Sequence, residues 1–168
     1  MARASRLSLP AGLRLFPDDL NAALRAALGA VIGVSLFVAA LDLAFAAALP
    51  EGYRQFYTAP LYPRMLSSCL GALKEELLYR LLLTTALAAL PTLWGKSAGP
   101  KWMIAAIVLA QFANVHALVL ELPPWGALRF WLVGCIWGWL YWRHGLASAM
   151  LGHGAVHLLL DPLLLRLL

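Results

Sequence analysis

The chain has 168 residues, of which 62% are hydrophobic and 12% are charged, and its formal net charge is +5. Soluble globular domains carry about 25% charged residues, so this composition excludes such a domain and predicts an integral membrane protein. The lysines and arginines are scattered over termini, loops and helix ends instead of forming a basic stripe, so we expect the lipid bilayer as a partner and exclude nucleic acid.

Apolar stretches predict an all-α bundle of about five transmembrane helices in a single membrane domain, residues 1–168. The first helix, residues 22–48, ends in a sequence that resembles a signal-peptidase site. It is longer than the apolar core of a signal peptide, roughly 7–15 residues, so we expect it to be retained. The other helices are expected at residues 62–93, 102–121, 126–142 and 145–166.

The interruptions between these helices contain a Pro, a Gly or a charge that disfavours a continuing helix, and the longest covers residues 49–64. With a cytoplasmic N-terminus, the cytoplasmic charges would be Arg3, Arg6, Arg14, Lys96, Lys101 and Arg143, and the outer ones Arg54, Arg64, Arg129 and Arg166. Because cytoplasmic loops are enriched in Lys and Arg, we expect a multi-pass cell-membrane protein with its C-terminus outside.

Ionisable residues also occur inside the apolar segments. They are Asp42, Lys74, Glu75, Glu76, Arg80, His116, His153 and His157. An ionised group near the bilayer centre costs about 2.5–3.5 kcal/mol, so each needs a partner or a wet cavity. Such residues favour a functional site within the membrane, although a cluster that only holds helices together remains an alternative.

Helical geometry separates the two adjacent glutamates of the second helix. At about 100° per residue, Glu76 and Arg80 lie about 40° apart with the acid first, which favours an ion pair. Glu75 lies on a different face, together with Tyr79 and Gly71. We therefore expect Glu76 to neutralise Arg80 and Glu75 to face a cavity, where it is free for chemistry.

His116 follows Phe112 by one helical turn, so the Phe112 ring can shield the imidazole from water. Asn114 lies about 160° around the same helix and is expected at another interface. On the residues alone, a histidine in this position can be either a helix contact or a catalytic group.

His153 and His157 are four residues apart and share a helix face, a spacing that also suits two ligands of one metal ion. Asp161 continues this stripe and is a candidate supporting partner. Pro162 is expected to mark the end of the helix, because a proline disfavours α geometry in the residue before it.

Three short sequences, EELLYR, FANVH and HGAVH, occur in this order in three predicted membrane helices. They resemble the motifs EExxxR, FxxxH and HxxxN or HxxxD of the CPBP family of intramembrane proteases, which includes CAAX prenyl endopeptidases and bacteriocin-processing or self-immunity proteins. The resemblance covers about residues 65–160. His157 stands where the family usually has Asn or Asp, and Leu81 stands where a glycine is common.

The resemblance implies a glutamic-type endopeptidase, a hydrolase with an intramembrane active site, that cleaves a membrane-associated peptide or protein terminus. Glu75 would activate a water, and His116 and His153 would complete the catalytic set. The supporting residues would be Glu76, Arg80 and His157. The resemblance favours a site without metal or other cofactor.

A zinc-dependent protease remains an alternative, with ligands drawn from Glu75, His116, His153 and His157. Two other classes also remain: a non-catalytic immunity or scaffold protein, and a transporter that relays protons through Glu and His. Secondary transporters are commonly built from internal repeats, and none is visible in this sequence, which argues against the last class.

Overall fold

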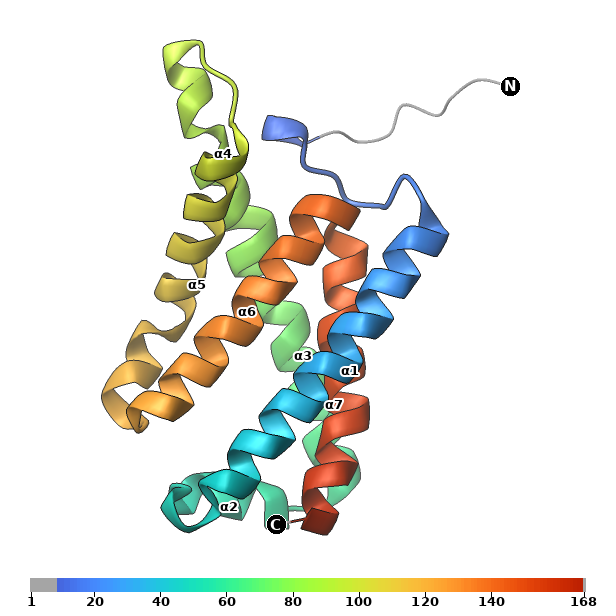
Figure 1. Cartoon of the computed structure of the whole chain (residues 1–168), viewed down its shortest axis with the longest axis vertical. Coiled ribbons are helices and arrows are strands. Elements are labelled where there is room, and N and C mark those ends of the chain that lie inside the picture. The colour runs from blue at the N-terminus through green and yellow to red at the C-terminus, as the bar shows by residue number, and fades with distance from the viewer. Residues whose placement is uncertain (1–8, 168) are drawn as a thin grey trace.

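The computed structural model describes residues 9–167, which form an all-α bundle (Figure 1). A continuous helical rod from Leu61 to Trp94 combines α3, η3, α4 and η4. The bounds are α1 (Leu20–Ala44), α2 (Glu51–Thr58), α3 (Leu61–Glu75), η3 (Glu76–Thr84), α4 (Thr85–Ala89), η4 (Leu90–Trp94), α5 (Pro100–Glu121), α6 (Pro124–His144) and α7 (Leu146–Leu167). Single 3₁₀ turns are η1 (Pro10–Gly12) and η2 (Ala46–Ala48). The prediction of helices in all five segments is confirmed.

The connection predicted at residues 49–64 contains a helix that the sequence reading missed. Pro50 directly precedes α2, and Pro60 directly precedes α3. Proline lacks a backbone N–H and fits at the start of a helix, where that donor has no partner within the helix. The two prolines therefore mark helix starts, and reading them only as interruptions was wrong.

Helix α7 packs against α1, α3 and α6, while α5 packs against α6 and η3. The α4 end of the long rod projects beyond the ends of α1 and α6, together with the start of α5 (Figure 1). Because of this projection, a residue far from the end of the rod or of α5 can meet a residue that lies close to the start of α7.

The segment before α1 fixes the start of α7. Leu146 N–H donates to Arg14 O at 3.0 Å, and Ala147 N–H donates to Leu15 O at 2.9 Å. These bonds satisfy two donors that have no partner within the helix. Gly145, between α6 and α7, has φ +91°, a conformation that strains other residues. Helix α7 is thereby held where it presents its histidines to the bundle interior.

The interior of the bundle is built around large side chains of α6. Trp137, Leu140 and Tyr141 are fully buried. Gly138 lies so close to α5 that an added Cβ would approach Ile107 within 2.5 Å. Small residues of this kind allow helices in a membrane to pack closely.

Apolar side chains also cover the outside of the bundle. On α1 the exposed ones recur every four residues: Leu20, Leu24, Leu28, Ile32 and Leu36. Among the described residues, the helices Leu20–Ala44 and Leu61–Trp94 are long and apolar enough to cross a membrane. A continuous apolar outer stripe is unfavourable in water and suits contact with lipid.

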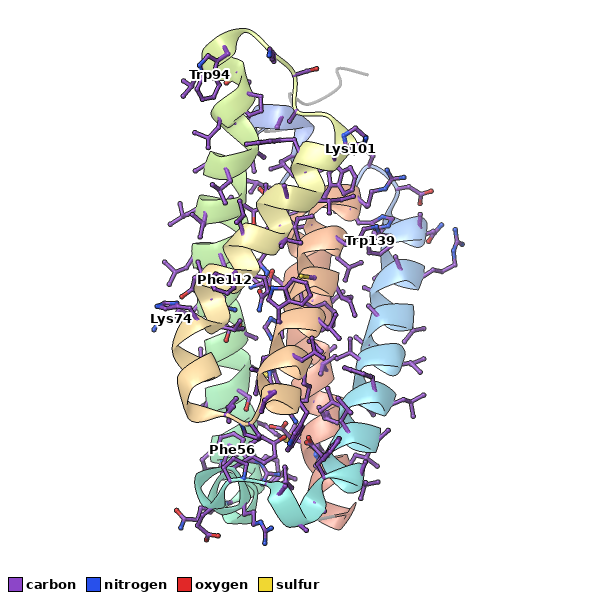
Figure 2. All side chains as sticks on the ribbon, turned by 60° about the vertical axis from the view of Figure 1, so that its left-hand side comes forward. Phe56, Lys74, Trp94, Lys101, Phe112 and Trp139 are labelled. Carbon is purple, nitrogen blue, oxygen red and sulfur yellow. The ribbon has the colours of Figure 1, made fainter. Side chains whose placement is uncertain are left out.

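Polar and aromatic side chains lie at both ends of the molecule. Trp94 and Lys101 project at one end, and Phe56 lies near the other (Figure 2). Trp94 is 69% exposed, as expected for an aromatic residue at a membrane interface. Two of the charges used to predict orientation, Arg3 and Arg6, lie outside the described residues, as does the side chain of Arg166.

Candidate active site

The two adjacent glutamates lie where the long rod changes its hydrogen-bond register. Helix α3 ends at Glu75, and residues Glu76–Thr84 are π-helical. The Thr84 hydroxyl donates to Tyr79 O, five residues earlier, at 2.7 Å. π-Helical segments are rare and frequently lie at functional sites. The assumption of regular α-helical geometry over this stretch was therefore wrong, although the two glutamates still face different ways.

Glu76 is fully buried and joins two helices. Its Oε1 lies 3.4 Å from Arg80 Nε, the pair predicted from their spacing, and 2.9 Å from His153 Nδ1 on α7. Arg80 Nη2 also donates to Gln111 Oε1 and to Gly134 O, both at 2.9 Å. Glu76 thus balances the charge of Arg80 and orients His153, and the sequence did not predict the second role.

His153 is held in one orientation by this carboxylate and by an aromatic neighbour. The Nδ1 atom of His153 faces Glu76, and it carries the hydrogen because a carboxylate can only accept a hydrogen bond. The other ring nitrogen, Nε2, is left for other contacts. Trp137 stacks on the imidazole with centroids 5.3 Å apart and planes 16° apart. Within the described chain, the buried Trp137 Nε1 has no hydrogen-bond partner.

Glu75 is partly buried and lines the cavity, as predicted for the glutamate that does not pair with Arg80. Its Oε2 accepts a hydrogen bond from Asn114 Nδ2 at 3.0 Å. Asn114 had been expected at another interface, and that expectation was wrong. Only one of Asn114 and His116 can face the cavity, because they point in nearly opposite directions from α5.

His116 is the residue that points away. It is exposed, and its Nδ1 lies 2.6 Å from Ala113 O in the same helix. Phe112, which was expected to shield it, is 60% exposed and projects outward (Figure 2). The structure therefore brings Glu75 and His153 to one cavity and does not bring His116 to them.

His157 lines the same cavity one turn after His153, with ring centroids 5.4 Å apart. Its Nδ1 lies 3.6 Å from Asp161 Oδ1, the expected supporting partner. The buried Asp161 also accepts a hydrogen bond from Ser68 Oγ at 3.3 Å. Helix α7 continues through Pro162 to its last turn, so the predicted helix end was wrong. A proline inside a membrane helix is tolerated where neighbouring helices satisfy the freed groups.

A second charged cluster joins α1, α2 and α6. Arg129 is 5% exposed, and its Nη1 donates to Asp42 Oδ1 and, at 2.8 Å, to the Tyr53 hydroxyl. Tyr53 in turn donates to Asp42 Oδ2. Arg129 and Arg64 had been counted as outer loop charges, but both are buried inside the bundle, Arg64 beside Asp161. Neither can contribute to the charge bias between the two membrane sides.

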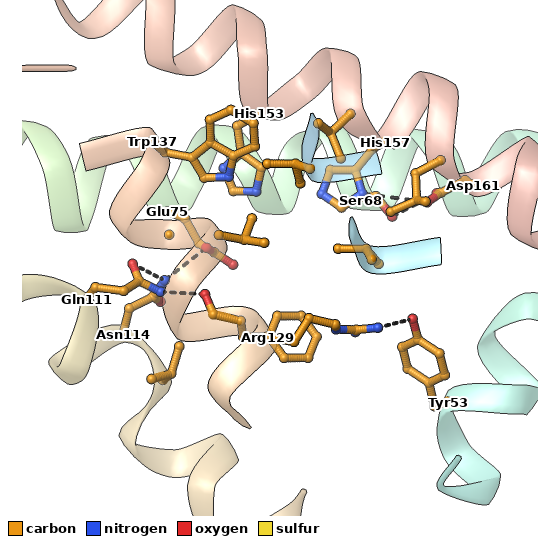
Figure 3. Close-up of a pocket in the computed structure, with 18 of the residues that line it drawn as sticks. Tyr53, Ser68, Glu75, Gln111, Asn114, Arg129, Trp137, His153, His157 and Asp161 are labelled. Carbon is orange, nitrogen blue, oxygen red and sulfur yellow. Dashed lines mark hydrogen bonds and ion pairs between the residues drawn. The ribbon is translucent and has the colours of Figure 1, made fainter. Parts of the chain in front are cut away.

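The cavity that these side chains line has a volume of about 330 Å³. Small-molecule sites typically have about 300–1,000 Å³. Figure 3 shows Glu75 and Asn114 on one side of it, His153 and His157 above, and the Arg129 side chain extending toward Tyr53 on the other side. The remaining lining is largely apolar and includes Val34, Val38, Phe130, Val133, Val156 and Leu160.

The predicted zinc ligands are not assembled. Among the side chains that the structure describes, no three His, Cys, Asp or Glu residues lie where they could hold one metal ion. His116 is remote from the cavity, and His153 Nδ1 is engaged by Glu76. What the cavity does assemble is a carboxylate, an amide and two imidazoles, each oriented by a partner.

Comparison with known proteins gives one match. The family model for type II CAAX prenyl endopeptidase Rce1-like proteins matches residues 57–159, more than half of the chain. This range includes the rod that carries both glutamates, the whole of α5 and α6, and both cavity histidines of α7. Neither the comparison with curated proteins nor that with solved structures finds a match.

Proposed function

Because the chain belongs to the type II CAAX prenyl endopeptidase Rce1-like family of intramembrane proteins, we propose that it hydrolyses a peptide bond in a membrane-associated peptide or protein terminus. The observation that carries this proposal is the division of labour between two neighbouring glutamates. Glu76 is committed to Arg80 and His153, whereas Glu75 faces a cavity large enough for a small peptide segment.

In the proposed reaction, Glu75 is the general base. It takes one proton from a water molecule while the water oxygen attacks the carbonyl carbon of the scissile bond. The proton then passes from Glu75 to the leaving nitrogen as the C–N bond breaks. The other hydrogen of the water bonds to His153 Nε2, whose direction is fixed by the contact between Nδ1 and Glu76. Asn114 keeps the Glu75 carboxylate in place.

The negative charge that develops on the carbonyl oxygen needs hydrogen-bond donors. Trp137 supplies one candidate, because this residue lines the cavity and its buried indole N–H lacks an acceptor within the described chain. His157 can add a second donor only as an imidazolium, because the hydrogen of its Nδ1 faces Asp161 and the Nε2 of a neutral ring can only accept. A donor without an acceptor in the free protein costs stability and becomes useful only when a substrate arrives.

His116 remains a predicted active-site residue on the family pattern. In the structure, however, the residue of α5 that contacts Glu75 is Asn114.

We also propose that the five long helices cross the membrane, with the N-terminus in the cytoplasm and the C-terminus outside. In this arrangement Glu75 and Asn114 lie within the bilayer, and the cavity extends from them to Tyr53 on the short helix α2.

We further propose that the reaction needs no metal. The proposal rests on the geometry of the donors, since His116 lies outside the cavity and the Nδ1 atoms of His153 and His157 face carboxylates.

The test is hydrolysis by the purified, reconstituted protein. Two peptides with the same sequence, ending in Cys-Val-Leu-Leu with and without an S-farnesyl group, are incubated with proteoliposomes. Mass spectrometry then identifies the new C-terminus. A protease gives a single shortened product, and cleavage of only the farnesylated peptide assigns prenylated substrates. If neither peptide, nor a longer membrane peptide carrying the same end, is cleaved, the chain is a non-catalytic member of its family.

A further inference from the structure

Gln111, on α5, is a buried polar residue that has no role in the reaction as described so far. It is 3% exposed, and both ends of its amide form hydrogen bonds. Its Oε1 accepts from Arg80 Nη2 at 2.9 Å and from Asn114 Nδ2 at 3.5 Å. Its Nε2 donates to Phe130 O at 3.2 Å. The side chain therefore connects the arginine of the long rod to the asparagine that contacts Glu75.

The partners of Gln111 determine which way its amide points. Arg80 can only donate and the Phe130 carbonyl can only accept, so Oε1 of Gln111 faces the arginine and Nε2 faces the carbonyl. An acceptor is thereby presented to Asn114, and the two hydrogens of Asn114 Nδ2 serve Gln111 Oε1 and Glu75 Oε2 (Figure 3). A reversed Asn114 amide would place its own oxygen against two acceptors. The orientation of Gln111 therefore fixes the donor that holds Glu75.

The neighbouring helix α6 leaves room for this amide at a glycine. A Cβ added at Gly134 would overlap the amide carbon, nitrogen and oxygen of Gln111. Gly134 O also accepts a hydrogen bond from Arg80 Nη2 at 2.9 Å. The backbone of α6 can approach both side chains only because position 134 has no side chain of its own. Any larger residue there must displace the Gln111 amide.

We propose that Gln111 is a positioning residue for the general base and acts through Asn114. The proposal rests on the proposed function, in which Glu75 takes a proton from water. Arg80 pairs directly with Glu76 and, through the two amides, also sets the direction of Glu75. One buried guanidinium thus orients both glutamates. Such support matters for rate, because a catalytic group displaced by about 1 Å can lose about 10²-fold in activity.

The experiment measures kcat and KM in proteoliposomes with the farnesylated peptide, or with the longer membrane peptide if only that one is cleaved. Gln111→Met keeps the size of the side chain and removes its hydrogen bonds, so kcat should fall about 2- to 10-fold with little change in KM. Gly134→Ala should lower kcat similarly, because its methyl group displaces the Gln111 amide. Gly138→Ala is the matched control, since its methyl group meets Ile107 instead, and it should keep the wild-type kcat per folded molecule.

A double-mutant cycle with Asn114 separates positioning from a general loss of packing. In the Asn114→Ala background, Gln111→Met should have no further effect on kcat, because the connection to Glu75 is already lost. An equal loss in both backgrounds, a wild-type kcat in Gln111→Met, or an equal loss in Gly138→Ala would overturn the proposal and leave the protease intact.

If the wild-type protein cleaves no peptide, the proposed function fails, and unfolding in sodium dodecyl sulfate still tests the connection between the two amides. Shifts of the unfolding midpoint in Gln111→Met and Asn114→Ala that are less than additive in the double variant support it, and additive shifts refute it.

Discussion

Replacing Glu76 by glutamine tests the buried network that holds the site together. Glutamine has nearly the same size, so Glu76→Gln removes a charge without opening a cavity. The change leaves Arg80, which is 2% exposed, without its counter-ion, and it weakens the support of His153. Removing one partner of a buried ion pair costs about 3–5 kcal/mol. Because Arg80 keeps its bonds to Gln111 and Gly134, we expect a loss of about 3 kcal/mol.

The assay is reversible unfolding of the purified protein in mixed detergent micelles with increasing sodium dodecyl sulfate. Glu51→Gln, at an exposed position of α2, is the control and should change stability by no more than about 0.5 kcal/mol. The double variant Glu76→Gln with Arg80→Met should be more stable than Glu76→Gln alone, because no unpaired charge remains. A stability of Glu76→Gln equal to wild type, or a double variant less stable than the single one, would refute the assigned network.

Three other predictions concern the α5 residues, metal and orientation. Asn114→Ala should lower kcat/KM at least tenfold through loss of the Glu75 contact, and His116→Ala should lower it less; the reverse order would show that His116 enters the cavity during catalysis. A strong chelator should leave activity unchanged, whereas loss that zinc restores would establish a metalloenzyme. A cysteine at the exposed Ser97, with Cys69 and Cys135 replaced, should react with a membrane-impermeant thiol reagent only from the cytoplasmic side, and labelling of intact cells would reverse the topology.

Helical periodicity predicted the part of the site that depends on neighbours in one helix. The spacing of Glu76 and Arg80 was enough to predict their ion pair and to separate Glu75 from it. The spacing of His153 and His157 likewise placed both imidazoles on one cavity-facing side of α7. These are local relations, and they persist even though the first pair lies in a π-helical segment.

The relations between helices could not be read from the sequence. The rotation of α5 about its own axis decides whether Asn114 or His116 faces Glu75, and neither residue shows by itself which face is buried. Arg129 follows a Pro-rich turn and resembled an interfacial charge. Its burial depends on Asp42, 87 residues earlier, which is a distant contact. An isolated aspartate in an apolar helix did signal that some cation must be near, because such a charge needs a partner.

The central claim is that Glu75 activates the water, and one comparison tests it most directly. Initial rates of peptide cleavage are measured in proteoliposomes for wild type, Glu75→Gln and Lys74→Gln, the last altering an adjacent charge that projects away from the bundle (Figure 2). General-base catalysis contributes about 10²–10⁴-fold, so Glu75→Gln should lose at least 100-fold in kcat while it stays folded, and Lys74→Gln should keep its activity. Wild-type activity in folded Glu75→Gln would contradict the account.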